Sequence, residues 1–153
     1  MSEELDRNQC SNQVLVNRER VLALGGFDEK IPAMQDHDMW VRLIAEYGDA
    51  YRINEPTYVV NDDRVLERIS SLNNKLNAIK MFEEKHGKLM SKRNKKNLAF
   101  YKQKVSGEKF SVFGYFSSLR YGLWELKTKH LLATIFKGLS KKRLDYLASG
   151  KEK

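Results

Sequence analysis

The chain has 153 residues, of which 41% are hydrophobic and 31% charged, and its formal net charge is +8. That composition can build a packed core and excludes wholesale disorder, and no apolar run approaches the ~18 residues that span a bilayer. The polar start is unlike a secretory signal, the single Cys10 excludes an internal disulfide, and His37, His86 and His130 lack zinc-site spacing. The sequence therefore favours a cytoplasmic protein with no metal site of its own.

The first third of the chain predicts short strands and helices in alternation. Residues 13–16 are β-prone, and a short helical segment after them can end at Gly25. Residues 35–47 change to a helical period, with apolar side chains on one stripe and Gly48 as the stop. Asp36 is a good N-cap type for this helix, and two further strand candidates follow at residues 50–54 and 57–61.

The rest of the chain predicts helices only. Ser70 or Ser71 can cap a first helix that ends at Gly87, and Ser91 can cap a second that ends near Gly107. Further helices are expected to open at Ser111 and at Thr128 and to cover residues 141–148. Residues 1–62 therefore read as a small α/β domain, and residues 63–153 as a basic, helix-rich C-terminal region.

Three short strands do not make a stable sheet by themselves. We therefore expect the α/β part to be one half of a larger architecture, completed by a separate N-terminal half or covered by a second copy of the chain.

Acidic residues gather at residues 28–38 of this basic chain, and two interpretations compete for Asp36 and Asp38. Carboxylates in a first helical turn satisfy free backbone N–H groups and complement the helix dipole, each contributing ~0.3–1 kcal/mol. One carboxylate is enough for that role. The other could act as a general base, provided that a substrate hydroxyl comes within hydrogen-bond reach. The residues alone leave both interpretations open.

The run "GGFDE", followed by a short loop and "QDHDMWVRL", resembles the C-terminal half of a family 2 glycosyltransferase with the GT-A fold, of the capsule and lipopolysaccharide type. The similarity extends over residues ~12–86, and its spacing is more specific than a lone Asp-x-Asp. The matching positions are Gly25, Gly26, Phe27, Asp28, Glu29, Gln35, Asp36, Asp38, Trp40 and Arg42.

This resemblance implies that Asp36 is the catalytic base of an inverting transfer, in which an acceptor sugar hydroxyl displaces a nucleoside diphosphate from a nucleotide sugar. The acceptor is expected to be a lipid-linked saccharide in bacterial surface polysaccharide synthesis. Asp38 is expected to hold the start of the helix and to pair with Arg42 at i,i+4. The two glycines would allow a tight turn, and Trp40 is expected to pack in the core rather than to bind sugar.

The chain departs from the family pattern in two places. The family's nucleotide-binding half, whose Asp-x-Asp holds a divalent metal (Mg or Mn) on the diphosphate, has no counterpart before residue 11. The family's Tyr-Arg-x-His after the strands lacks its histidine here. We therefore expect donor and metal binding only with the missing half, and an inactive isolated chain.

Basic residues concentrate in the second part of the chain. Residues 1–84 carry 10 Lys and Arg against 16 Asp and Glu, whereas residues 85–153 carry 18 against 4. Basic helices beside apolar, aromatic runs suit an anionic membrane surface, although packing of the apolar faces with solvated lysines explains the pattern equally well. A motif that reads nucleic acid is absent, so nucleic acid is not expected as a partner. The residues expected to face the membrane are Lys92, Arg93, Lys95, Lys96, Lys141, Lys142 and Arg143.

Two functions therefore follow from the sequence. One is sugar transfer at the cytoplasmic face of the inner membrane, with this chain as the acceptor side. The alternative is a non-catalytic module, derived from such an enzyme, that binds a membrane or a partner.

Overall fold

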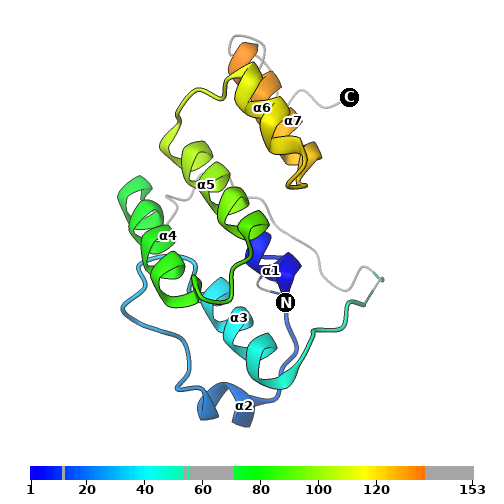
Figure 1. The fold of residues 1–153 in the computed structure, drawn as a ribbon. Helices are drawn as coiled ribbons and strands as arrows, with labels where there is room; N and C mark the ends of the chain where they lie inside the picture. The colour runs from blue at the N-terminus through cyan, green and yellow to red at the C-terminus, as the bar shows by residue number, and fades with distance from the viewer. Residues whose placement is uncertain (12, 54, 56–70, 137–153) are drawn as a thin grey trace, which may run out of the picture.

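The computed structural model describes residues 1–11, 13–53, 55 and 71–136. Within these ranges the chain forms only α-helices, joined by turns and irregular segments (Figure 1). In chain order they are α1 (Ser2–Asp6), α2 (Arg18–Ala23), α3 (Gln35–Tyr47), α4 (Leu72–His86), α5 (Lys92–Ser106), α6 (Val112–Leu119) and α7 (Trp124–Ile135).

The expected α/β class, and with it the incomplete GT-A half, is wrong, because no strand forms anywhere in the residues that the structure describes. Residues 13–16 and 50–53 were predicted as strands but are irregular. Leu15 and Tyr51 are 100% and 93% exposed in them. A β-prone segment becomes a strand only when a neighbour pairs with its backbone and covers one face, and neither segment has such a neighbour among the residues described. The third candidate, residues 57–61, lies outside the described residues.

The helix predictions were more accurate. The predicted bounds of α3 are those observed, and Gly48 ends it. Ser71, one of the two serines that the sequence offered as cap, caps α4 by accepting the Asn74 N–H. Ser91 caps α5 as predicted, in a capping box with Asn94.

Two helices differ from expectation. The short helix α1 was not predicted. Helix α7 begins at Trp124 rather than at Thr128, because Leu123 adopts a left-handed conformation and starts the helix. Thr128 lies inside α7, where its hydroxyl donates to the Trp124 carbonyl at 2.7 Å. The helix expected at residues 141–148 lies outside the described residues.

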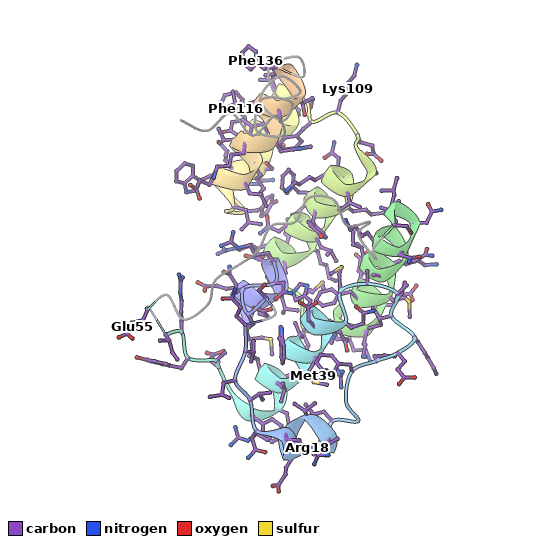
Figure 2. All side chains as sticks on the ribbon, turned by 180° about the vertical axis from the view of Figure 1, so that it is seen from behind. Arg18, Met39, Glu55, Lys109, Phe116 and Phe136 are labelled. Carbon is purple, nitrogen blue, oxygen red and sulfur yellow. The ribbon has the colours of Figure 1, made fainter. Side chains whose placement is uncertain are left out.

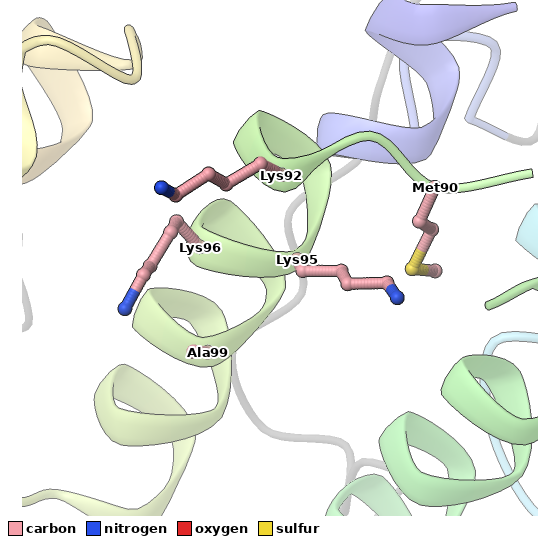
Figure 3. Close-up of a pocket in the computed structure, with 5 residues that line it drawn as sticks. All are labelled: Met90, Lys92, Lys95, Lys96 and Ala99. Atoms are coloured by element: carbon pink, nitrogen blue, oxygen red, sulfur yellow. The ribbon is translucent and has the colours of Figure 1, made fainter.

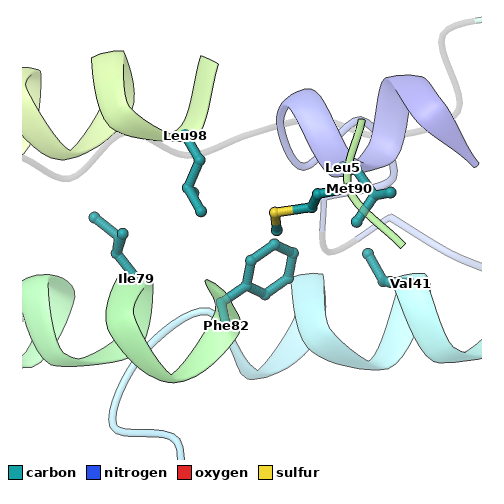
Figure 4. Close-up of a cluster of buried hydrophobic side chains, with 6 residues drawn as sticks. All are labelled: Leu5, Val41, Ile79, Phe82, Met90 and Leu98. Carbon is teal, nitrogen blue, oxygen red and sulfur yellow. The ribbon is translucent and has the colours of Figure 1, made fainter. Parts of the chain in front are cut away.

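Helix α1 lies against both α3 and α5, and α5 packs beside α4 (Figure 1). Their main apolar cluster takes side chains from all four helices and from the loop between α4 and α5 (Figure 4). It consists of Leu5, Val41, Ile79, Phe82, Met90 and Leu98. Residues from both predicted regions thus share one core. The boundary expected at residue 62 lies outside the described residues and stays a prediction.

Helices α6 and α7 form a hairpin that lies beside α5, and the turn between the two helices contacts the first turns of α5 (Figure 1). A second apolar cluster of Phe100, Phe110 and Leu131 attaches the hairpin to α5. Among the described helices, none is long and apolar enough to cross a bilayer.

Candidate functional site

The two glycines before the acidic cluster form a turn that is fixed to α3. Gly25 and Gly26 have φ values of +80° and +72°, which side chains with a Cβ rarely adopt. Arg42 of α3 donates from Nη1 to the Leu24 carbonyl and from Nη2 to the Gly26 carbonyl, both at 2.8 Å. The guanidinium fork therefore holds the turn against the helix, a role of Arg42 that the sequence did not indicate.

Asp38 is fully buried and lies at the centre of a network of cations. Its carboxylate accepts from Arg42 Nε at 2.9 Å and from Lys85 Nζ at 3.1 Å, and its Oδ1 lies 2.8 Å from His86 Nε2. Burial by itself would raise the pKa of Asp38, but the hydrogen bonds from His86 and Lys85 and the nearby positive charges outweigh it. The pKa falls to about 2. The expected i,i+4 pair with Arg42 is present.

Lys85 connects this network to the surface. Its ammonium group donates to Asp28 Oδ2 at 2.7 Å as well as to Asp38. The hydrogen bond from Lys85 and that from the Lys30 backbone lower the pKa of Asp28. Sequence reasoning missed Lys85 and His86. Basic residues in the last turn of α4 suggest only a helix-dipole role, and nothing local in the sequence reveals partners 47 and 48 residues away.

Asp36 differs from Asp38 in its surroundings. It was expected to be the N-cap, but Met34 takes that position in a left-handed conformation, and Asp36 lies inside the first turn. Its Oδ1 accepts the adjacent His37 N–H at 2.8 Å, and its Oδ2 accepts from Asn8 Nδ2 at 2.7 Å. The carboxylate is partly exposed. No positive side chain pairs with Asp36 within the described part of the chain, so this carboxylate keeps lone pairs for another donor.

Beneath Asp36 and Asp38 lies a stack of rings. His37 stacks on Phe82 with a centroid distance of 4.4 Å, and Phe82 contacts His86 at 4.7 Å. His37 Nε2 lies 2.6 Å from the Glu4 carbonyl oxygen, and burial lowers the pKa of His37. This packing fixes the first turn of α3 against α1 and α4.

The remaining predicted residues have simpler positions. Trp40 is 7% exposed, donates from Nε1 to the Ser11 carbonyl at 2.6 Å and meets Phe27 edge-on, so it packs in the core as expected. Gln35 is partly exposed, and Glu29 is exposed at the turn.

Two shallow hollows lie on the described surface. One, of about 340 Å³, is lined by Asp28, Ile31, Met81, Glu84 and Lys85. The other, of about 400 Å³, lies along the first turns of α5 and is lined by Met90, Lys92, Lys95, Lys96 and Ala99 (Figure 3). Asp28 therefore faces a hollow, whereas Asp36 lines neither of the two.

The predicted basic positions divide into two sets. Lys92, Lys95 and Lys96 are exposed on α5, whereas Arg93 forms an ion pair with the buried Asp6, with 2.9 Å between Arg93 Nη2 and Asp6 Oδ2. The other set, Lys141, Lys142 and Arg143, lies outside the described residues. In the ranges that the structure covers, no group of three or more His, Cys, Asp and Glu side chains is arranged to hold a metal ion.

A second buried polar centre, which the sequence did not reveal, joins α1, α5 and the α6–α7 hairpin. Lys127 is fully buried and donates to Asn97 Oδ1 and to the carbonyls of Ser118 and Gly122 at 2.7–3.0 Å. Asn97 in turn donates to Asp6 Oδ1 at 2.9 Å. Burial lowers the pKa of Lys127.

Comparison with known proteins gives one partial similarity. The chain is 28% identical, over 74 residues, to an Escherichia coli (strain K12) protein named "Putative colanic acid biosynthesis glycosyl transferase WcaA". The alignment covers 48% of this chain and 26% of that protein, so the chain matches about a quarter of its relative's length. No family model and no solved structure matches the chain. A relation to glycosyl transfer is therefore supported by sequence, over part of the chain.

Proposed function

We propose that this chain takes part in the transfer of a sugar from a nucleotide sugar to a saccharide acceptor, in the synthesis of a bacterial surface polysaccharide. The partial similarity to a protein named for colanic acid biosynthesis supports the reaction class. The acceptor is proposed to be a lipid-linked saccharide, which places the reaction at the cytoplasmic face of the inner membrane. Donor and divalent metal are proposed to bind outside this chain.

The observation that carries the proposal is the contrast between Asp36 and Asp38. Asp38 is fully buried and its oxygens are held by three cationic or imidazole side chains, so no substrate reaches it. Asp36, two residues away, is partly exposed and is oriented by Asn8 and by a backbone N–H. A general base needs a carboxylate that is held in position and yet open to a substrate hydroxyl. Of the pair, Asp36 meets that need.

In the proposed step, Asp36 accepts the proton of the acceptor hydroxyl as that oxygen attacks the anomeric carbon. The new glycosidic C–O bond forms while the bond from the anomeric carbon to the diphosphate breaks, and the nucleoside diphosphate leaves with the electron pair. Asp38, Arg42 and Lys85 do not touch the substrate. They fix the first turn of α3 and the glycine turn, and thereby hold Asp36 in place.

Asp36→Asn in the full-length gene product tests this role. Loss of a positioned general base lowers kcat by about 10²–10⁴-fold, whereas the asparagine keeps the shape of the side chain. Glu46→Gln, an exposed acid on the same helix, is the matched control and should keep wild-type turnover. Circular dichroism checks that both variants are folded. Near-normal turnover of a folded Asp36→Asn variant would contradict the assignment and leave a non-catalytic binding module as the function.

A further inference from the structure

The α6–α7 hairpin presents large apolar side chains to solvent over its whole length. On α6, Phe113 is 84% exposed and Phe116 65% exposed, and on α7 Trp124 is 66% exposed. Figure 2 shows Phe116 and Phe136 on the hairpin, at the end of the molecule opposite Arg18. Such a concentration on one supersecondary unit marks an interaction surface rather than scattered surface residues. The exposed apolar residues of the hairpin, here called the apolar face, are Val112, Phe113, Phe116, Trp124, Leu132, Ile135 and Phe136.

The hairpin cannot turn these side chains inward, because its other side is already in use. Tyr115 Oη lies 2.7 Å from Thr128 Oγ1 between the two helices. Phe110 and Leu131 pack on Phe100 of α5, and Lys127 is held by α5 and by the turn of the hairpin. The inner side of the hairpin is therefore held against α5 by apolar packing and hydrogen bonds. The apolar face stays exposed to solvent.

Lysines that form no ion pair with any residue in the described ranges adjoin the apolar face. The turn between α6 and α7 lies on the first turns of α5, where Asn97 donates to the Tyr121 carbonyl at 2.9 Å. Lys92 and Lys96 stand on these same turns, on the side toward the hairpin (Figure 3). Residues 92–136 hold ten Lys and Arg against two acidic residues. An apolar surface with cations at its edge is complementary to an anionic surface that has an apolar interior.

We propose that the α6–α7 hairpin binds the surface of an anionic lipid bilayer. Its phenylalanines and Trp124 enter the boundary between headgroups and acyl chains, while Lys92 and Lys96 contact the anionic headgroups. A second copy of this chain is a less suitable partner, because a twofold contact would bring the same basic residues of both copies together. This binding does not depend on sugar transfer by Asp36.

Vesicle binding by the full chain tests the proposal. Vesicles of phosphatidylglycerol and phosphatidylcholine in equal parts should bind the protein, and phosphatidylcholine vesicles should bind it at least tenfold more weakly. Trp124 should shift its fluorescence to shorter wavelength on binding. In Trp124→Phe the remaining, buried Trp40 should show no shift. Raising the salt to about 1 M, where the Debye length is about 3 Å, should release the protein.

Two variants, each with a matched control, separate the apolar from the electrostatic contribution to binding. Phe113→Ser with Phe116→Ser should weaken binding at least tenfold, whereas Leu15→Ser with Leu22→Ser, two exposed leucines elsewhere, should not. Lys92→Gln combined with Lys96→Gln should weaken binding about 30-fold, because each near-surface cation adds about 1 kcal/mol. The matched combination of Lys80→Gln with Lys88→Gln, two exposed lysines elsewhere, should weaken binding less than about threefold at the same net charge.

Equal binding to both kinds of vesicle, or binding that the double phenylalanine variant retains, would overturn the proposal. So would a stable dimer that this variant dissociates, since a second copy would then cover the apolar face. Asp36→Asn should bind vesicles like the wild type, so failure of the catalytic proposal and failure of this one are distinguishable.

Discussion

Asp38→Asn removes the carboxylate on which Arg42, Lys85 and His86 converge. The asparagine has nearly the same shape, so packing is preserved while the negative charge is lost. Because Asp38 is fully buried, Arg42 is then left in a partly desolvated site without this counter-charge, and Lys85 keeps only its ion pair with Asp28. Removing one partner of a buried ion pair is costly for that reason, about 3–5 kcal/mol in well-buried cases.

The pKa of Asp38 gives an independent value for how much its charged carboxylate contributes to the free energy of folding. In an unfolded chain an aspartate titrates near pH ~3.9, and each unit of difference is worth about 1.4 kcal/mol. In the folded protein Asp38 titrates at about 2. The charged carboxylate therefore contributes about 2–3 kcal/mol to folding. The contribution is fully present above the unfolded pKa and is lost as the pH falls from about 4 toward 2. We expect Asp38→Asn to lower the free energy of unfolding by about 2–4 kcal/mol near neutral pH.

Urea unfolding followed by circular dichroism at a series of pH values measures both effects. Asp36→Asn is the matched control. This variant should lower the free energy of unfolding by less than about 1 kcal/mol, because Asp36 is partly exposed and its carboxylate accepts only from one side-chain amide and one backbone N–H. The wild type should lose more stability than Asp38→Asn between about pH 4 and 2. Equal stability of the two variants, together with equal acid sensitivity of wild type and Asp38→Asn, would refute the reasoning.

Three further predictions concern other parts of the molecule. Lys127→Met should destabilise the protein by about 1–3 kcal/mol, measured by urea unfolding, because one buried and two partly buried oxygen acceptors lose their donor. Burial, followed by the charge of Glu4, raises the pKa of Cys10 to about 11. At mildly alkaline pH its thiol should therefore react with a disulfide reagent about a hundredfold more slowly than free cysteine, and Glu4→Gln should speed that reaction. Gly26→Ala should cost about 1–2 kcal/mol in thermal unfolding, because φ is +72° there, whereas alanine at the exposed, helical Glu83 should cost almost nothing.

The helices could be predicted where their signals are local. Ser71, Ser91 and Gly48 mark helix ends through side-chain caps or backbone freedom, which depend on a few neighbouring residues. Strand formation depends on a distant neighbour, so the β-prone residues 13–16 and 50–53 misled the prediction. Helix α1 is too short to show a periodicity, and only its tertiary contacts explain it.

The candidate site was predictable to a similar extent. The pair of Asp38 and Arg42 follows from helical spacing alone, and the structure confirms it. The contacts of Lys85 and His86 with Asp38, and of Asn8 with Asp36, join residues 28 to 48 positions apart. Such pairs are set by how the helices pack, which a single sequence does not reveal. The role of Asp36 as a base stays a prediction.

The position of α1 has a consequence for folding during translation. Leu5 belongs to the same apolar cluster as Leu98, and Asp6 accepts hydrogen bonds from Asn94 and Asn97. A ribosome adds about 5–20 residues per second, so the first helix waits several seconds for partners made some ninety residues later. Until then Leu5 can contact Val41 but not Leu98, and Asp6 lacks its two asparagine donors. The layer between α3 and α5 can close only after α5 has left the exit tunnel.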